Sequence, residues 1–265
     1  MWCLVRADDA AHARRRIAEA AARYELPAPP GDRGRPVGSR HGGLGCWFVT
    51  GLAADPGLRE RLRDVYWIGG GSGAGKSTVA RRLADQYGLL RYATDDVMAE
   101  HGGLMAREDS PFLRAFGAMD MDERWVSRSP QVMLETFHWF RGEGFELIVD
   151  DLLQLAGSGA GVIAEGFRLL PRLVRPLVAD PRHAVWLLPA PDFRRAAFEN
   201  RGAPLQFWQQ TSDPDRALRN LLERDRMFTA QLREEAGRLA LPFIEVDATV
   251  TEDALVERVA ETFGL

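Results

Sequence analysis

The sequence predicts an α/β protein, with a parallel β-sheet covered by helices on both faces. From residue 65 to residue 265, short apolar runs alternate with segments in which apolar residues recur at helical spacing. Regular alternation of strand and helix is typical of a parallel sheet between two helical layers. The chain has 265 residues, of which 46% are hydrophobic and 27% charged, and this composition suits a globular domain.

The length fits one large domain, or one domain with an extension. We assign residues 1–64 to an N-terminal extension of unknown role and residues 65–265 to the main domain. Within the extension, strands are predicted near residues 2–5 and 47–50. A Pro/Gly-rich stretch at 27–36 breaks both periodic patterns. Proline at position 56 is suited to the first turn of a short helix.

The main domain is predicted to contain five strands. They are expected at residues 65–68, 89–94, 161–165, 183–188 and 242–246. A helix should follow the first strand and end at Gly88, and residues 97–140 should be mostly helical. Residues 145–151 fit either a strand or a helix. We favour a helix, because a strand would leave only residues 157–160 for the crossover to the next parallel strand.

A glycine-rich segment directly follows the first predicted strand. Its sequence fits G-x-x-x-x-G-K-[ST], a pattern in which backbone N–H groups surround phosphate oxygens at a helix N-terminus. Lys76 is the only lysine among 34 basic residues, and a compact ammonium suits a position between two phosphates better than the arginine fork. Ser77 would bind Mg²⁺. The predicted nucleotide-binding residues of this loop are Gly70, Gly71, Ser72, Gly73, Ala74, Gly75, Lys76, Ser77 and Thr78.

Acidic residues end the second and third predicted strands, where ligands gather in open α/β sheets. Asp95 and Asp96 follow the second strand. Either is a candidate base for an acceptor hydroxyl, and either could instead cap the next helix. Glu165 ends the third strand and is a candidate to support the metal. Arg168 could reach an anionic acceptor or simply pair with Glu165; Asp96 is a second candidate contact to the acceptor.

Arginines are frequent between residues 194 and 226, which we predict to be a lid region. A mobile segment there could bring arginines onto a transferring phosphoryl group. Arg194 and Arg201 are candidate nucleotide contacts and Arg224 a candidate catalytic residue, although most arginines here are expected on a solvated helix face. The aromatic residues between the strands are expected to be mainly core. They are Trp125, Phe137, Trp139, Phe207 and Trp208.

Residues 65–265 resemble the P-loop small-molecule kinases. That group includes shikimate and gluconate kinases, nucleoside monophosphate kinases, chloramphenicol phosphotransferase and the zeta toxins. The resemblance depends on the loop at 70–77, on Asp95-Asp96, on the segment 165–168, on residues 222–225 and on residues 246–248. It implies a three-layer P-loop NTPase fold with a five-stranded parallel sheet, ATP and Mg²⁺ as cofactors, and Asp247 beside the adenine.

The sequence therefore leads us to expect an ATP-dependent kinase that phosphorylates a hydroxyl of a small metabolite or natural product. Two alternatives stay open: a nucleic-acid end kinase, and a regulatory P-loop NTPase without a small acceptor. The net charge of −4 does not favour nucleic acid. No apolar run reaches the roughly 20 residues that span a bilayer, and the early acidic residues do not suit a signal peptide. We expect a cytoplasmic protein of unknown oligomeric state.

Overall fold

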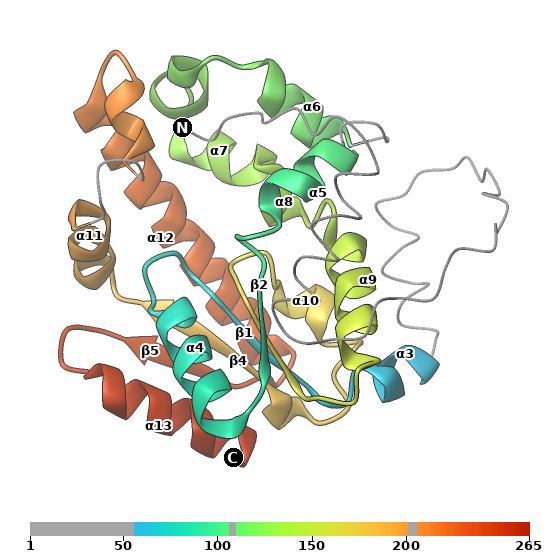
Figure 1. Ribbon diagram of the computed structural model, residues 1–265. Coiled ribbons are helices and arrows are strands. Elements are labelled where there is room, and N and C mark those ends of the chain that lie inside the picture. The colour runs from blue at the N-terminus through green and yellow to red at the C-terminus, as the bar shows by residue number, and fades with distance from the viewer. Residues whose placement is uncertain (1–55, 106–109, 201–205) are drawn as a thin grey trace, which may run out of the picture.

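A five-stranded, all-parallel sheet forms the centre of the protein, as predicted. The computed structural model describes residues 56–105, 110–200 and 206–265. Its strands are β1 (Val65–Gly70), β2 (Leu90–Ala93), β3 (Val162–Glu165), β4 (Ala184–Pro189) and β5 (Phe243–Val246), in the spatial order β2-β3-β1-β4-β5. The central strand β1 therefore lies between β3 and β4, and its carboxyl end is close to those of both neighbours (Figure 1).

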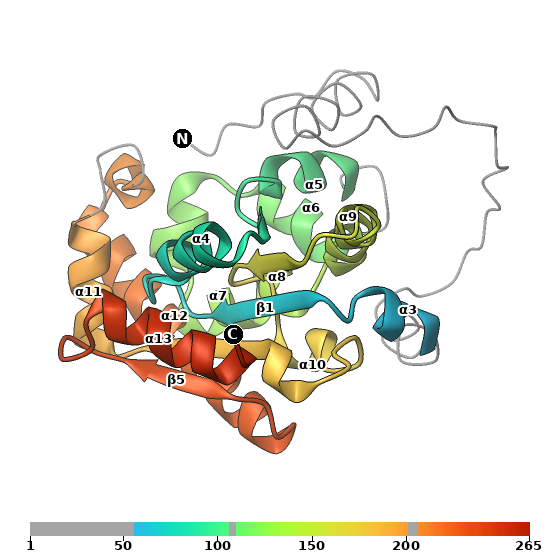
Figure 2. The same ribbon diagram turned by 60° about the horizontal axis from the view of Figure 1, so that its bottom comes forward.

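Helices cover both faces of the sheet (Figure 2). On one face lie α4 (Lys76–Tyr87) and α13 (Glu252–Phe263), and on the other α9 (Phe145–Ala156), α10 (Pro171–Val174) and α12 (Pro214–Arg238). Alternate strand residues enter different cores: Trp67 packs on the α12 side, whereas Ile68 packs on the α4 side. Both side chains are fully buried, as is usual in a sheet covered on two sides.

A second group of helices lies above the sheet at the top of Figure 1. It contains α5 (Met98–Met105), α6 (Pro111–Ala118), α7 (Pro130–Thr136) and α8 (His138–Arg141), with a π-helical turn at Glu123–Ser127. α11 (Pro191–Glu199) follows β4, and α12 packs against α7 and α11. The predicted helical character of residues 97–140 is confirmed where the structure describes them.

The ambiguous segment at 145–151 is helical, as favoured, because it forms the first part of α9. Its residues Phe145, Ile148 and Leu152 are buried on the α12 side of the sheet. The short connection of residues 157–160, which could not form a parallel crossover, therefore indicated the correct structure.

Part of the region assigned to the N-terminal extension packs on the main domain. A short helix α3 (Pro56–Arg61) precedes β1. Leu62 is buried in the core on the α12 side, and the Arg59 guanidinium donates to the backbone oxygen of Pro176. The strands predicted at 2–5 and 47–50 lie outside the described residues.

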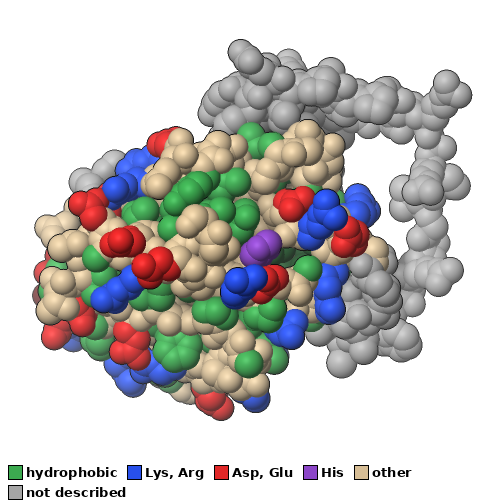
Figure 3. Space-filling view, turned by 90° about the horizontal axis from the view of Figure 1, so that it is seen from below, with side chains coloured by type: hydrophobic (Ala, Val, Ile, Leu, Met, Phe, Trp, Pro, Cys, Tyr) green, Lys and Arg blue, Asp and Glu red, His purple; other side chains and the backbone are tan. Residues whose placement is uncertain are grey.

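Within the described ranges, no helix combines the length and apolar character needed to cross a bilayer. On the face seen from below in Figure 3, acidic and basic side chains are interspersed, with hydrophobic ones between them. The basic side chains of described residues on that face form no continuous stretch. That nucleic acid is not a favoured partner stays a prediction.

Candidate functional site

The glycine-rich loop, residues 70–77, connects the carboxyl end of β1 to the N-terminus of α4. Gly70 adopts φ 125°, and a Cβ there would lie 2.1 Å from the backbone oxygen of Leu187 on β4. The chain can therefore leave the sheet at this point only with glycine. Its last two residues, Lys76 and Ser77, already belong to α4, so that the helix N-terminus faces the loop.

Lys76 is buried, with 8% of its surface exposed. Its ammonium donates to the backbone oxygen of Gly71 at 2.8 Å, across the loop. The sequence-predicted strand, glycine loop and helix are thus found together, with the lone lysine directed into the loop. Thr78 follows in the first turn of α4 and is half-buried.

Glu165 lies beside this loop because β3 is the neighbour of β1, with Ile68 and Glu165 in register. Its side chain is 4% exposed, hydrogen-bonds to Ser77 and lies 3.5 Å from the guanidinium of Arg91. Burial raises the pKa of the Glu165 carboxyl above its ordinary value, while Lys76 and the Ser77 hydrogen bond act to lower it. The predicted pair of Ser77 and Glu165 is brought together.

Asp95 and Asp96 lie just past β2, whose last residue, Ala93, is in register with Glu165. Both side chains are exposed. They differ in surroundings: Asp96 forms an ion pair with Arg91 at 3.3 Å, whereas Asp95 interacts electrostatically with Glu165 and Arg168. The backbone N–H of Met98, at the start of α5, donates to the backbone oxygen of Asp95. Of the two acids, Asp95 is thus the one coupled to the other candidate site residues.

Arg168 is buried, and its guanidinium lies 4.0 Å from the centre of the Trp139 ring. It donates to the backbone oxygens of Thr94 and Gly144 and approaches the Nδ1 atom of His101 at 3.1 Å. Burial lowers its pKa to about 10. The predicted contact to an acceptor stays a prediction, since these bonds direct the guanidinium toward protein groups.

His101, Asp151 and Tyr92 extend this arrangement and were not predicted as site residues. The Nε2 atom of His101 lies 3.0 Å from Asp151 Oδ2, to which the Tyr92 hydroxyl donates at 2.7 Å. Burial, with Asp151 nearby, raises the pKa of Tyr92. These residues come from α5, α9 and β2, and no local spacing in the sequence connects them.

The predicted lid arginines have different environments. Arg194, on α11, is 1% exposed and contacts the glycine-rich loop. Arg224, on α12, is buried; it pairs with Asp225 and lies within 5.4 Å of the ring centres of Trp125, Phe137 and Phe140. Arg201 lies outside the described residues.

The predicted adenine-side residue, Asp247, lies in the turn after β5. It accepts hydrogen bonds from the backbone N–H and the hydroxyl of Thr249, and these bonds lower its pKa. Of the five aromatic residues expected to be mainly core, Trp125, Trp139 and Trp208 are buried. Phe137 and Phe207 are partly buried against a hydrophobic cluster.

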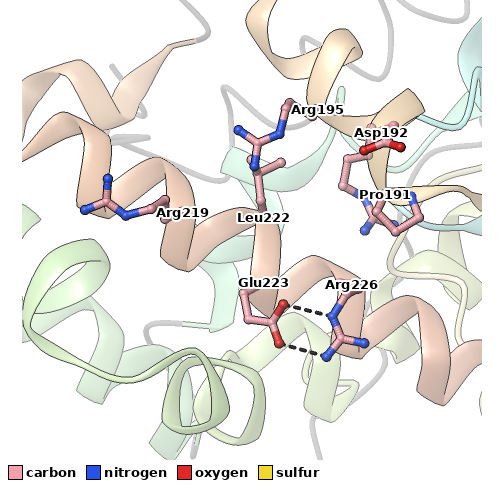
Figure 4. A pocket seen from close by; sticks show the side chains of 8 residues that line it. Pro191, Asp192, Arg195, Arg219, Leu222, Glu223 and Arg226 are labelled. Atoms are coloured by element: carbon pink, nitrogen blue, oxygen red, sulfur yellow. Dashed lines mark hydrogen bonds and ion pairs between the residues drawn. The ribbon is translucent and has the colours of Figure 1, made fainter.

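A cavity of about 170 Å³ lies between α11 and α12, on the arginine-rich surface predicted as a lid (Figure 4). Arg195 on α11 and Arg219 on α12 line it, and Arg226 is held by Glu223. Acidic and basic groups are thus mixed around it. Its lining residues are Pro191, Asp192, Arg194, Arg195, Arg219, Leu222, Glu223 and Arg226.

Comparison of the chain with protein-family models and with curated proteins returned no match. The argument for a function therefore comes from the site itself. The carboxyl edge of the sheet brings together a glycine-rich loop, a buried lysine, a hydroxyl paired with a buried carboxylate, and an exposed aspartate. This combination of groups is suited to a phosphorylated ligand with a divalent cation.

Proposed function

We propose that the protein is an ATP-dependent kinase that transfers the γ-phosphoryl group to a hydroxyl of a small metabolite or natural product. The observation that carries the proposal is the grouping of Lys76, Ser77 and Glu165 at the carboxyl end of the central strand. The resemblance of the loop sequence to phosphate-binding loops supports it.

Lys76 and the loop amides would hold the phosphates. The ammonium now donates to the Gly71 carbonyl, and a phosphate oxygen at the loop would offer it a stronger, charged acceptor. The N-terminus of α4 adds the positive end of the helix dipole. These groups favour an anion at this point of the sheet.

Ser77 and Glu165 fit a magnesium ion in their chemistry, because both offer the oxygen atoms that Mg²⁺ prefers. Among the described residues no group of three or more His, Cys, Asp or Glu side chains could hold a metal. Mg²⁺ bound with nucleotide needs only one or two protein ligands, since phosphates and water supply the rest. The ion would neutralise charge on the phosphates, and a cation would favour the ionised form of the buried Glu165 carboxyl.

Asp95 is the proposed base. It would accept the proton of the acceptor hydroxyl while the new O–P bond forms and the bond from the γ-phosphorus to the bridging oxygen breaks, which releases ADP. Arg168 lies close enough to interact electrostatically with Asp95.

The test is in two steps. Calorimetric titration of the full chain with ATP and Mg²⁺ should give saturable binding that Lys76→Ala abolishes. A panel of small hydroxyl compounds is then screened for ADP release and for a product heavier by one phosphoryl group. No ATP binding would refute the proposal. Binding with hydrolysis but no acceptor would favour a regulatory NTPase, and phosphorylation of oligonucleotide ends would favour an end kinase.

A further inference from the structure

We propose that Arg194 and Thr229 form a tether that fixes the shape of the glycine-rich loop, so that Arg194 acts on the nucleotide through the loop. Arg194 is then a positioning residue. The inference deepens the proposed function and rests on it for its functional meaning, although the tether itself can be tested without any nucleotide.

The contacts join three segments that are distant in sequence. Arg194, on α11, donates from Nε to the backbone oxygen of Ser72 at 3.3 Å. Its Nη2 atom donates to the hydroxyl of Thr229 on α12. The loop is thus linked through one buried guanidinium to the longest described helix.

In this arrangement the Thr229 hydroxyl can only accept a hydrogen bond from Arg194. Its single proton is donated to the backbone oxygen of Asp225, one turn earlier, at 2.9 Å. The oxygen lone pairs are left for the N–H of Arg194. Asp225 also interacts electrostatically with Arg194, so α12 supplies both a hydrogen-bond acceptor and a counter-charge.

The loop backbone rests directly on the tether. A Cβ atom at Gly71 would lie 2.8 Å from the Thr229 hydroxyl and 3.0 Å from Arg194 Nη2. A Cβ at Gly73 would lie 3.2 Å from the Cβ of Ala197, also on α11. Glycine at these positions therefore allows the loop to approach both helices closely.

Holding a carbonyl also orients an amide. In a planar trans peptide, the C=O of one residue and the N–H of the next point in opposite directions. The described residues contain no cis peptide bond. By fixing the Ser72 carbonyl toward α11, Arg194 turns the N–H of Gly73 to the opposite side, and Lys76 does the same for the N–H of Ser72 through the Gly71 carbonyl. These are two of the amides that would surround a phosphate.

The experiment compares Thr229→Val, which keeps the shape of the side chain but loses the acceptor, with Thr229→Ser, which keeps the hydroxyl. Thr136→Val is the matched control, because the Thr136 hydroxyl also donates one turn back, to Val132, and accepts from an arginine, Arg128. Hydrogen exchange of the peptide covering residues 69–77 is measured without nucleotide, and ATP·Mg²⁺ affinity by titration.

Thr229→Val should speed exchange in the loop peptide by about tenfold, the effect of losing one hydrogen bond to a charged group, and should weaken ATP·Mg²⁺ binding several-fold. Thr229→Ser and Thr136→Val should both behave as wild type. Equal loop exchange in Thr229→Val and Thr136→Val would overturn the tether, as would a serine variant that behaves like valine. Faster exchange with unchanged ATP affinity would overturn its role in positioning. If the wild type binds no ATP, the proposed function fails, and exchange still decides whether the tether exists.

Discussion

At the position of Lys76 we expect the shape of the side chain to matter as well as its charge. The other 33 basic residues of the chain are arginines, and Lys76 is the only lysine. Its ammonium lies inside the glycine-rich loop and donates to Gly71, in a space that 8% exposure leaves nearly closed. A guanidinium is planar and wider and cannot replace a point donor there. We therefore expect a geometric requirement for lysine at this residue.

A labelling experiment tests this assignment. Lys76 and the α-amine of the chain are the two amines that an acylating reagent can modify, so mass mapping assigns each adduct. ATP·Mg²⁺ should suppress labelling at Lys76 and leave the α-amine unchanged, because the phosphates would cover the ammonium. Arg81→Lys adds an exposed lysine on α4 as a control, and nucleotide should not protect it.

Lys76→Arg should lose ATP binding although it keeps the charge, by at least about tenfold, since lysine and arginine are not interchangeable at such a site. Titration with ATP·Mg²⁺ measures the effect. Normal binding by this variant, or labelling of Lys76 that nucleotide does not affect, would remove the basis for a phosphate site at this loop.

The two aspartates after β2 should separate on substitution. Asp95→Asn should reduce turnover by at least ~10²-fold with ATP affinity largely kept, because base catalysis contributes about that much. Asp96→Asn should cost only a few-fold, since the Asp96 carboxylate is exposed and pairs with Arg91. Turnover on the acceptor found by screening is the measurement. A larger loss of turnover in Asp96→Asn than in Asp95→Asn would make Asp96 the base. Normal turnover in both variants would mean that neither is the base.

At the scale of secondary structure, the turn after β3 is fixed by one close contact. Gly166 adopts φ 150°, and a Cβ there would lie 1.7 Å from the hydroxyl oxygen of Thr94, the first residue after β2. Thr94 directly precedes Asp95. The two strand ends that carry Glu165 and Asp95 are therefore packed against each other without room for a methyl group.

Gly166→Ala should consequently destabilise the protein by about 2–4 kcal/mol, from overpacking and backbone strain together. Gly237→Ala is the matched control. Gly237 lies within α12, nothing lies within 4 Å of its added Cβ, and alanine should stabilise the helix by up to ~1 kcal/mol. Denaturant unfolding measures both. Equal effects of the two substitutions would contradict the close packing at Gly166.

The secondary-structure elements were predictable from the sequence, whereas the contacts between distant elements were not. Apolar patterns identified all five strands, because those patterns are local and each strand is covered by core. The helix at 145–151 was favoured because a strand there would leave too short a crossover to β3. The His101–Asp151 contact could not be predicted in this way, since its residues are 50 positions apart and meet only through the fold. Arg224 was predicted from a helix rich in arginine, but no pattern distinguished it, buried among aromatic rings, from the exposed arginines beside it.

Over the whole molecule, burial of charge is concentrated around the candidate site. Lys76, Arg168 and Arg194 each follow the carboxyl end of a strand and are buried, and a further buried charged pair, Arg224 with Asp225, lies on α12. Burying a charge is costly unless it is paired. Several buried cations at one edge of a sheet are a feature often found at functional sites.

His138 makes the stability of the whole molecule sensitive to acid. Its ring is buried beside Phe116, Phe137 and Trp139. Burial, reinforced by the charges of Arg168 and Arg124, lowers its pKa to about 3. Between the unfolded pKa of about 6.5 and this value, the unfolded chain binds a proton that the folded protein does not. Protonation of this group in the unfolded chain therefore lowers the free energy of unfolding as the pH falls from about 6.5 toward 3, and above about pH 6.5 that loss is absent.

Between pH 7 and pH 4 the wild type should lose about 3 kcal/mol of unfolding free energy through His138 alone. His138→Phe removes the titrating group, so the variant should lose correspondingly less over the same interval, whatever the new ring costs in packing at neutral pH. Denaturant unfolding at several pH values gives the unfolding free energy of both proteins as a function of pH. The two curves should run parallel above about pH 7.5. Parallel slopes over the whole range would mean that His138 is protonated in the folded protein, with its charge accommodated despite two nearby arginines.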